Sequence, residues 1–262
     1  SIQNPFDKDV LQLQEKSRVR KQKELFVVEG QREIHLALMG GYEIASLIYC
    51  DHIFEESSLQ NFNLQNDKII KITKGVYQKL ARRDSTEGVI AVLKSKKHAL
   101  YSISFKSKNP LIFVAEAPEK PGNIGALLRT ADAAGLDAVL IANPKTDLYN
   151  PNIIRSSVGC IFTNTIATGS TQEIISFLKE NNIAIYCAAL SASQSYEAIN
   201  YLNGSAIVVG TEATGLSNEW LENSSQNIII PMHGQIDSLN VSVSAGILIF
   251  EAKRQRILNN EY

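Results

Sequence analysis

The sequence contains few cysteines and no long apolar stretch, and both shortages limit the class of protein. Cys50, Cys160 and Cys187 are far apart and form no C-x-x-C pair, which favours reduced, buried thiols over a disulfide framework. No apolar run approaches the roughly 18 to 20 residues that a membrane-spanning helix needs, and the polar N-terminal residues do not resemble a signal peptide. We therefore expect a protein of the cytoplasm with no membrane partner.

Complete nucleotide-binding and metal-binding motifs are also missing. The apolar run at 111–117 is followed by PEKPGNIGALLR, which lacks the G-x-G of a dinucleotide-binding loop. GTEATG at 210–215 has the glycine spacing of a phosphate-binding loop but lacks the lysine that should follow it. There is no H-E-x-x-H motif and no cluster of cysteine and histidine, so no metal site is expected.

The charges are unevenly distributed along the chain. Residues 1–110 contain 18 Lys and Arg against 13 Asp and Glu, a net charge of +5, whereas residues 111–262 have a net charge of −6. Such an asymmetry suggests that the first half meets a polyanion such as RNA and the second half does not. Chance sorting of surface charge explains the asymmetry equally well at this point.

Apolar periodicity predicts an α/β fold in two parts. The first part combines a charged helix at 9–23 and helices at 31–39 and 74–83 with strands at 26–30, 46–50, 68–72 and 89–93. A basic, weakly patterned stretch follows, and we expect domain boundaries at 1–95, 96–109 (linker) and 110–262. The second part alternates helical patterns with strands that are apolar on both faces, which predicts a parallel sheet; these strands lie at 111–117, 138–142, 183–190, 206–210 and 227–230.

The first polar strand end is PGNIGALLRTADAAG at 121–135. Asn123 is a good N-cap and Gly135 a good residue for the helix C-terminus. Arg129 falls opposite the expected buried stripe, with Gly125 one turn before it, which would leave space for a phosphate or a ribose beside the guanidinium. A plain solvated arginine on an ordinary helix is the alternative for this helix alone.

Two further strand ends are rich in glycine and polar residues. At 210–216, GTEATGL offers Gly210 for close approach of the backbone to a ligand and Glu212 as a carboxylate beside it, although a simple turn explains both. Ser238 and Asn240 stand where the chain enters the last helix, and either could simply cap it. Because ligands of parallel sheets bind at the carboxyl ends of strands, we expect the three segments to meet.

Taken together, these segments resemble the three signature motifs of the SpoU/TrmH family of RNA ribose 2′-O-methyltransferases. The motifs are N-x-G-x-x-x-R from Asn123, G-x-E-x-x-G-L from Gly210, and I-P-M…S-L-N-V from Ile230 to Val241. VRKQKELFVVEGQREIHLAL at 19–38 and EGVIAVL at 87–93 are similar to the family's small, ribosomal-protein-like substrate-binding domain. The resemblance therefore covers nearly the whole chain.

The resemblance implies a fold, a cofactor and partners. The fold would be a parallel-sheet domain of the SPOUT type with a trefoil knot, preceded by a small α/β RNA-binding domain. The cofactor would be S-adenosylmethionine and the substrate RNA, with ribosomal RNA favoured by the appended domain. The C-terminal domain would form a homodimer, partly through a seam on the helix 241–258 made of Val241, Ala245, Leu248 and Ala252.

The resemblance also implies roles for residues of the site. Residues that hold the cofactor would be Gly210, Ile230 and Leu239. The catalytic neighbourhood would be Arg129, Asn123, Glu212, Ser238 and Asn240. We favour Arg129 as a clamp on a phosphate and stabiliser of the developing alkoxide over a role as base, because a guanidinium in a protein does not give up its proton.

RNA-binding residues follow partly from the resemblance and partly from charge. Arg155 and Ser157 match a family stretch near the substrate. The cations of the first half add Arg18, Arg20, Lys21, Arg82 and Arg83. If these cations capture the RNA, a chain that starts near Asn109 should still fold and dimerise but lose most RNA affinity.

Two other functions remain open at this stage. A non-catalytic RNA-binding or ribosome-assembly protein would use the same basic first half, and methylation of transfer RNA would use the same site. An α/β enzyme that acts on a small molecule with another nucleotide is less compatible with the missing phosphate loops. Binding of S-adenosylmethionine, followed by methyl transfer to RNA, separates these functions.

Overall fold

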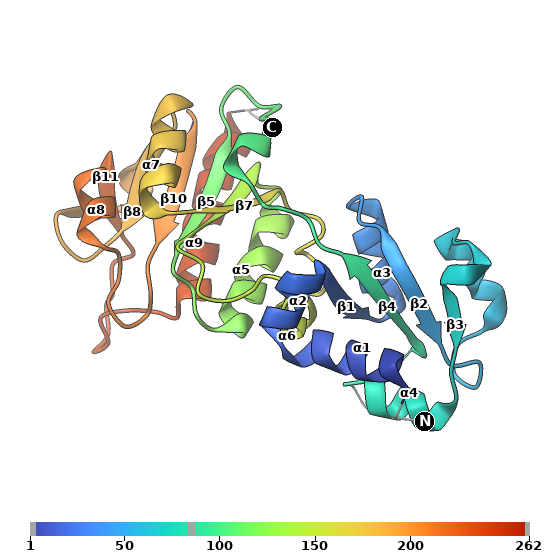
Figure 1. Cartoon of the computed structure of the whole chain (residues 1–262). Coiled ribbons are helices and arrows are strands. Elements are labelled where there is room, and N and C mark those ends of the chain that lie inside the picture. Colours follow the sequence, from blue (N-terminus) through green and yellow to red (C-terminus); the bar gives the residue numbers. More distant parts are fainter. Residues whose placement is uncertain (1–3, 83–86, 260–262) are drawn as a thin grey trace. The chain divides into compact units, whose positions relative to one another are not determined.

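The computed structural model describes residues 4–82 and 87–259, and its packing divides the chain into two units (Figure 1). The first unit is discontinuous and consists of Ser1–Lys97 together with Asp147–Thr163. The second consists of His98–Thr146 and Asn164–Tyr262. In the described part of the chain, no helix is both long and apolar enough to cross a membrane.

The first unit is built on a mixed four-stranded sheet in the order β1-β4-β2-β3. Strand β4 pairs antiparallel with β1 and β2, whereas β2 and β3 are parallel. The strands are β1 (Leu25–Glu29), β2 (Ile44–Tyr49), β3 (Ile69–Lys71) and β4 (Val89–Lys94). The helices are α1 (Pro5–Glu15), α2 (Ser17–Lys23), α3 (Gln31–Met39), α4 (Lys74–Leu80) and the short 3-10 helices η1 (Glu56–Phe62) and η2 (Asn66–Lys68).

The single helix expected at 9–23 is wrong in one respect, because two helices occupy this region. Lys16 has extended backbone angles (φ −114°, ψ 110°) and separates α1 from α2. Asn4 accepts a hydrogen bond from the Phe6 N–H and caps α1, with Pro5 at its first position. The break turns α2, with its cations Arg18 and Lys21, away from the direction of α1.

A segment from the second half of the sequence, 147–163, packs within the first unit. It includes α6 (Pro151–Ser156) and carries Tyr149, whose ring stacks on Phe26 at 4.2 Å. Asp147 pairs with the Arg20 guanidinium at 2.5 Å; the Arg20 side chain is buried, and that of Asp147 is only 10% exposed. No pattern in the sequence indicates this packing, and the boundaries expected at 1–95, 96–109 and 110–262 stay a prediction that does not account for it.

The second unit contains a seven-stranded sheet in the order β7-β6-β5-β10-β8-β11-β9, and every pairing in it is parallel. This confirms the expected α/β fold with a parallel-sheet domain after a small α/β domain. The strands are β5 (Leu111–Glu116), β6 (Ala138–Ala142), β7 (Ile166–Gly169), β8 (Ala184–Ala188), β9 (Ser193–Ser195), β10 (Ser205–Val209) and β11 (Gln226–Ile229). Two edge strands, β7 and β9, were not expected, because both are short and only weakly apolar.

Helices cover this sheet (Figure 1), and one of them begins earlier than expected. The helices are α5 (Pro121–Ala134), α7 (Thr171–Glu180), α8 (Asn218–Glu222) and α9 (Val241–Leu258), with 3-10 helices η3 (Leu100–Ser102) and η4 (Tyr196–Ala198). Lys120, not Asn123, is the N-cap of α5, because Pro121 is preorganised for the first helical position. The expected end of α5 is confirmed by Gly135, which has a left-handed conformation (φ 61°).

Helix α9 corrects the expected dimer seam. Ala245, Leu248 and Ala252 are buried inside the subunit, on a helix that packs beside α5. They are therefore core residues of the subunit and are not available to a partner. Other apolar residues of α9 remain exposed, among them Val243 and Phe250.

Candidate active site

A cluster of polar loop residues in the second unit lies where its strand order reverses. From β5 the chain continues outward to β6 and β7, and it then returns on the other side of β5 as β8 and β10. Ligands of open parallel sheets bind outside the carboxyl ends of strands at such a switch point. Polar loops follow β5, β8, β10 and β11 at this edge.

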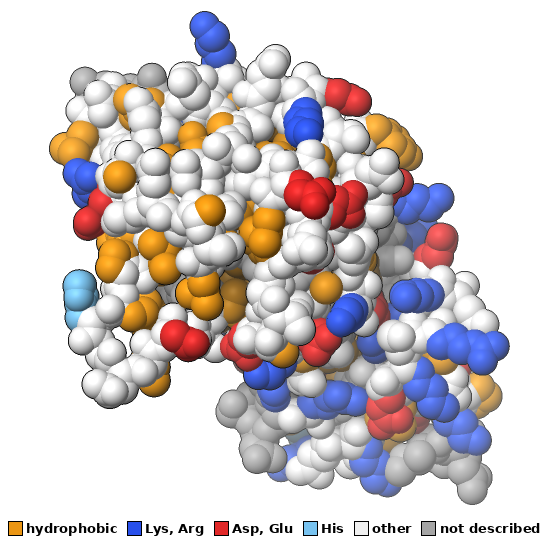
Figure 2. Space-filling view, turned by 90° about the vertical axis from the view of Figure 1, so that its left-hand side faces the viewer, with side chains coloured by type: hydrophobic (Ala, Val, Ile, Leu, Met, Phe, Trp, Pro, Cys, Tyr) orange, Lys and Arg blue, Asp and Glu red, His pale blue; other side chains and the backbone are white. Residues whose placement is uncertain are grey.

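These loops enclose a pocket of about 770 Å³, within the range of roughly 300 to 1,000 Å³ that small-molecule sites occupy. Figure 2 shows the face of the second unit on which apolar side chains gather. The pocket wall combines apolar side chains, such as Val209 and Leu248, with backbone of the loops. Six of the expected site residues line it: Gly210, Glu212, Ile230, Ser238, Leu239 and Asn240.

Glu212 joins three segments that are far apart in the sequence. Its Oε1 accepts hydrogen bonds from the side-chain amides of Asn123, at 3.1 Å, and Asn240, at 2.9 Å. Its Oε2 forms an ion pair with Lys120, which immediately precedes α5. The structure therefore brings together one residue from each of the three sequence motifs, as the common strand-end position led us to expect.

The charge state of Glu212 follows from these partners. Hydrogen bonds from the Lys120 ammonium and then from the Asn123 amide hold the pKa of the Glu212 carboxyl below its ordinary value, although desolvation acts in the opposite direction. The group is consequently a carboxylate at neutral pH and has no proton to give. Its geometry suits a residue that orients two amide groups.

Asn240 explains why polar residues are concentrated before the last helix. It is the N-cap of α9, and its Oδ1 accepts hydrogen bonds from the N–H of Ser242, at 3.0 Å, and from the Ser242 hydroxyl. Its Nδ2 is thereby directed at Glu212 and at Asn123 Oδ1, 3.4 Å away. Capping and site-building are thus two roles of one side chain. Ser238 is exposed and donates a hydrogen bond to Asp237.

Gly210 is required by a close approach of backbone to backbone. A Cβ atom at this position would lie 2.2 Å from the carbonyl carbon of Gly215. The loop closes on itself through two hydrogen bonds between Thr211 and Gly215, and the latter has a φ of 68°. The close approach at Gly210 is therefore between two parts of the loop backbone, and the expected approach of a ligand to this glycine stays a prediction. The loop lines the pocket wall.

Arg129 lies outside this network. It is exposed on α5, and six residues along a helix place it roughly 9 Å beyond Asn123. Among residues 4–82 and 87–259, its guanidinium makes no hydrogen bond or ion pair with another side chain. Gly125 is buried, so it does not leave the open space that we expected beside the Arg129 guanidinium. The donors of Arg129 are available to a ligand.

One residue that sequence reasoning missed is Glu116, the last residue of β5. Its buried carboxylate accepts hydrogen bonds from the Ser217 N–H (2.9 Å), the Ser217 hydroxyl (2.7 Å) and the Thr171 hydroxyl (3.2 Å). It thereby ties the end of the Gly210 loop to β5. An acidic residue that closes an otherwise apolar strand was the available signal.

The expected RNA-binding residues separate into exposed and buried ones. Arg18 and Lys21 are exposed on α2, and Figure 2 shows Lys and Arg side chains gathered on the first unit. Arg20 was wrongly included, because it is buried, pairs with Asp147 and donates to two carbonyls of α1. Ser157 was also wrongly included, since it is fully buried and its hydroxyl donates to the Ile154 carbonyl.

Arg82 and Arg155 line one pocket of the first unit. Arg83 lies outside the described residues.

Comparison with known proteins now places these features. Residues 110–250 match the model of the SpoU rRNA Methylase family, and residues 4–91 match the MRM3-like substrate binding domain. The chain is 26% identical, over 253 residues, to the 23S rRNA (guanosine(2553)-2′-O)-methyltransferase RlmP of Bacillus subtilis, with 97% of this chain and 98% of the relative covered.

Solved structures give the same result. A crystal structure of an RNA 2′-O ribose methyltransferase has a TM-score of 0.83 and 37% identity, with 98% of each chain covered. An AdoMet-bound rRNA methyltransferase from Sinorhizobium meliloti has a TM-score of 0.88 and 26% identity, covering 97% of this chain and 96% of its own. The chain belongs to the SpoU family of rRNA methylases.

Proposed function

We propose that the protein is an RNA methyltransferase that transfers the methyl group of S-adenosylmethionine to a ribose 2′-hydroxyl of ribosomal RNA. The family match over residues 110–250 carries the proposal. The joining of Asn123, Glu212 and Asn240 at the strand ends supports it. Relatives named as 23S rRNA 2′-O-methyltransferases favour ribosomal RNA as the substrate.

The residues of the pocket fit this cofactor. S-adenosylmethionine, when bound, supplies a methyl group on a sulfonium and therefore already a good electrophile. Ile230 and Leu239 would hold its apolar parts, and the tight loop at Gly210 would present backbone groups to its polar parts. The pocket is large enough for a nucleoside with an amino-acid tail.

The chain's own residues would act mainly by positioning. A ribose hydroxyl is a poor nucleophile at neutral pH, so holding it in line with the methyl group lowers the barrier substantially. Glu212 would keep Asn123 and Asn240 oriented, with Ser238 beside them at the mouth of the pocket. Arg129, with its free donors, would clamp an RNA phosphate and stabilise the charge that develops on the ribose oxygen.

Methyl transfer is the direct test of this function. Calorimetric titration with S-adenosylmethionine should show binding to the isolated protein. Radiolabelled cofactor should then label ribosomal RNA and leave transfer RNA unlabelled. Binding of the cofactor without transfer to either RNA would favour a non-catalytic RNA-binding protein. Labelling of transfer RNA alone would show that the substrate is transfer RNA and not ribosomal RNA.

Gly210→Ala is expected to abolish measurable binding of S-adenosylmethionine. The added methyl group would meet backbone atoms of Gly215 and Leu216, which cannot move without opening the loop that lines the pocket. Calorimetric titration measures the loss. Gly234→Ala is the matched control, because a Cβ there meets nothing within 4 Å. Unchanged affinity in Gly210→Ala would show that the loop does not contact the cofactor.

A homodimer is part of the proposal, but through a different face of α9 from the one first expected. Val243, Phe250 and Ile257 are 51%, 48% and 49% exposed and follow one another at seven-residue spacing, which places them along one side of the helix. A helix that is apolar on both sides buries both. One side packs within the subunit, so a second copy would cover the other.

Phe250→Glu is expected to convert the dimer into a monomer, because the carboxylate would be desolvated in the apolar interface. Light scattering at micromolar concentration gives the mass. Met39→Glu is a matched control, because Met39 is 73% exposed on α3 of the first unit and is not part of α9. A monomeric unmodified protein would contradict the proposal outright.

The trefoil knot and the location in the cytoplasm complete the proposal. Residues 237–240, which immediately precede α9, and Val241 at its start line the same pocket as the loops after β8 and β10, as a C-terminal segment tucked beneath the strand ends would. This supports the knot that the family resemblance implies. If ribosomal RNA is the substrate, the protein must meet ribosomes or their precursors, which favours the cytoplasm.

A further inference from the structure

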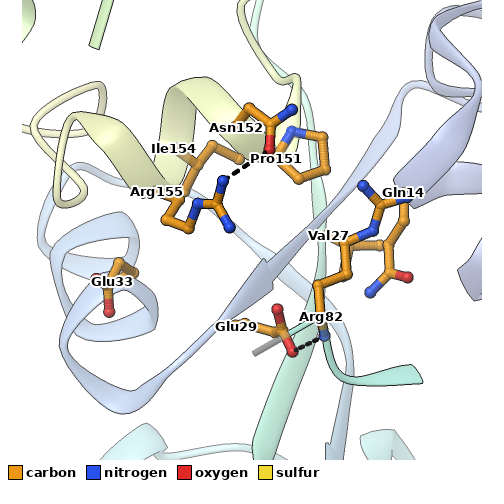
Figure 3. Close-up of a pocket in the computed structure, with 9 residues that line it drawn as sticks. All are labelled: Gln14, Val27, Glu29, Glu33, Arg82, Pro151, Asn152, Ile154 and Arg155. Carbon is orange, nitrogen blue, oxygen red and sulfur yellow. Dashed lines mark hydrogen bonds between the residues drawn. The ribbon is translucent and has the colours of Figure 1, made fainter. Parts of the chain in front are cut away.

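A small pocket of the first unit brings together two arginines that are 73 positions apart in the sequence. Arg82 follows α4, and Arg155 lies on α6, in the segment 147–163 (Figure 3). Figure 3 shows their guanidinium groups on different sides of the pocket. The side-chain amides of Gln14 and Asn152 also line it.

Both guanidinium groups have donors to spare. Among the residues that the structure describes, the Arg155 guanidinium makes one hydrogen bond, from Nη2 to Asn152 Oδ1 at 3.3 Å. In the described part of the chain, the guanidinium of Arg82 makes no hydrogen bond or ion pair, while its backbone N–H donates to Glu29 at 2.8 Å and fixes the start of the side chain. A guanidinium has five N–H donors, so the pair can satisfy several acceptor oxygens.

The size and charge of the pocket restrict its ligand. Its volume is about 30 Å³, the share of one water molecule in the liquid and far below the roughly 300 Å³ of a site for a small organic ligand. A nucleobase is therefore too large, whereas the oxygens of a phosphate at the mouth are not. Glu29 and Glu33 also line the pocket, and Glu33 accepts a hydrogen bond from Arg32. The negative charges of the two carboxylates offset the positive charges of the two arginines, so the pocket offers little net attraction to a free phosphate dianion.

We propose that Arg82 and Arg155 clamp one phosphodiester group of RNA, each donating to a different non-bridging oxygen of the same phosphate. The proposal rests on the proposed function, in which RNA is the substrate. A phosphodiester carries a single charge and is delivered by an RNA that also meets the exposed cations of α2. Such a contact fixes the register of the RNA on the first unit and reads no base.

The clamp makes a specific prediction for salt dependence. RNA affinity is measured by fluorescence anisotropy with a labelled ribosomal RNA fragment over a series of potassium chloride concentrations. Arg82→Ala and Arg155→Ala should each weaken binding on the order of fivefold and lower the slope of log Kd against log salt by about one. The double variant should lose little more than either single one, because only one phosphate contact exists to be lost.

Arg18→Ala provides the matched control. Arg18 is exposed on α2 and does not line the pocket, so its effect should add to that of Arg82→Ala, and the combined slope should fall by about two. Inorganic phosphate should compete with RNA no better than potassium chloride of the same ionic strength. Circular dichroism should show every variant folded, because both arginines of the clamp are exposed.

The outcomes separate the clamp from the proposed function. Additive losses for Arg82 and Arg155, with a slope change of about two, would mean two separate phosphates and overturn the clamp. Variants that bind like the unmodified chain would overturn it as well, and so would displacement of RNA by millimolar phosphate at constant ionic strength. An unmodified chain that binds no ribosomal RNA would overturn the proposed function together with the clamp.

Discussion

Arg129→Ala is expected to lower the rate of methyl transfer by at least ~100-fold while the affinity for S-adenosylmethionine stays almost unchanged. Arg129 is exposed on α5 and does not line the pocket of about 770 Å³, so its loss removes no contact to the cofactor. Loss of a charged donor that stabilises developing negative charge typically costs this much in rate. Single-turnover transfer with labelled cofactor, together with calorimetric titration, measures both quantities.

Arg129→Lys separates the two parts of the proposed role. A lysine keeps the positive charge but lacks the planar fork of donors, so it should recover only part of the lost rate. A variant Arg129→Ala that keeps more than about a tenth of the activity would show that the residue has no such role, since a lost donor should cost far more. Parallel thermal melting checks that the fold is intact.

The sequence predicted the parallel sheet well because its strands are apolar on both faces. Runs such as AVLIA at 138–142 can only be buried between two layers of helix, and this run became β6 with the same bounds. The edge strands β7 and β9 were missed because edge positions do not demand such a pattern. Lys16 gave no local signal for the break between α1 and α2, since lysine is a good helix former.

The candidate site was predictable where the local sequence alone explains the position of a residue. Asn240 is both a cap and a partner of Glu212, and a capping residue before an apolar helix is visible in the sequence. Buried charges were not predictable in this way. Arg20 and Glu116 look like surface residues by type, and only long-range partners, Asp147 and Ser217, explain their burial.

The same long-range packing changes the result expected for a shortened protein. Sequence alone suggested that a chain starting near Asn109 would fold, because charge and composition change near that point. In the structure, however, the segment 147–163 packs within the first unit, where Tyr149 stacks on Phe26 and Phe162 lies against Tyr42. Removing the first 108 residues would remove the partners of this segment.

We therefore expect a chain that starts at Asn109 to aggregate or to melt far below the full-length protein. Four large side chains, those of Tyr149, Ile153, Ile154 and Phe162, are at least 94% buried in the intact chain. Exposing an apolar side chain of this size costs about 1.5 to 3 kcal/mol, so exposing all four approaches the whole stability of a typical domain, roughly 5 to 15 kcal/mol. Asp147 would also lose its buried partner Arg20.

Thermal melting and light scattering of the shortened chain measure this effect. The informative control is the same shortened chain with Tyr149→Ser, Ile153→Ser and Phe162→Ser, which should regain solubility because most of the exposed apolar surface is gone. In the full-length protein, Asp147→Ala should be strongly destabilising, since it leaves the Arg20 guanidinium buried without its counter-charge. A shortened chain that is monodisperse and melts like the intact protein would show that 147–163 does not depend on the first unit. The RNA-binding unit and the methyltransferase unit would then be separable, as the charge pattern alone suggested.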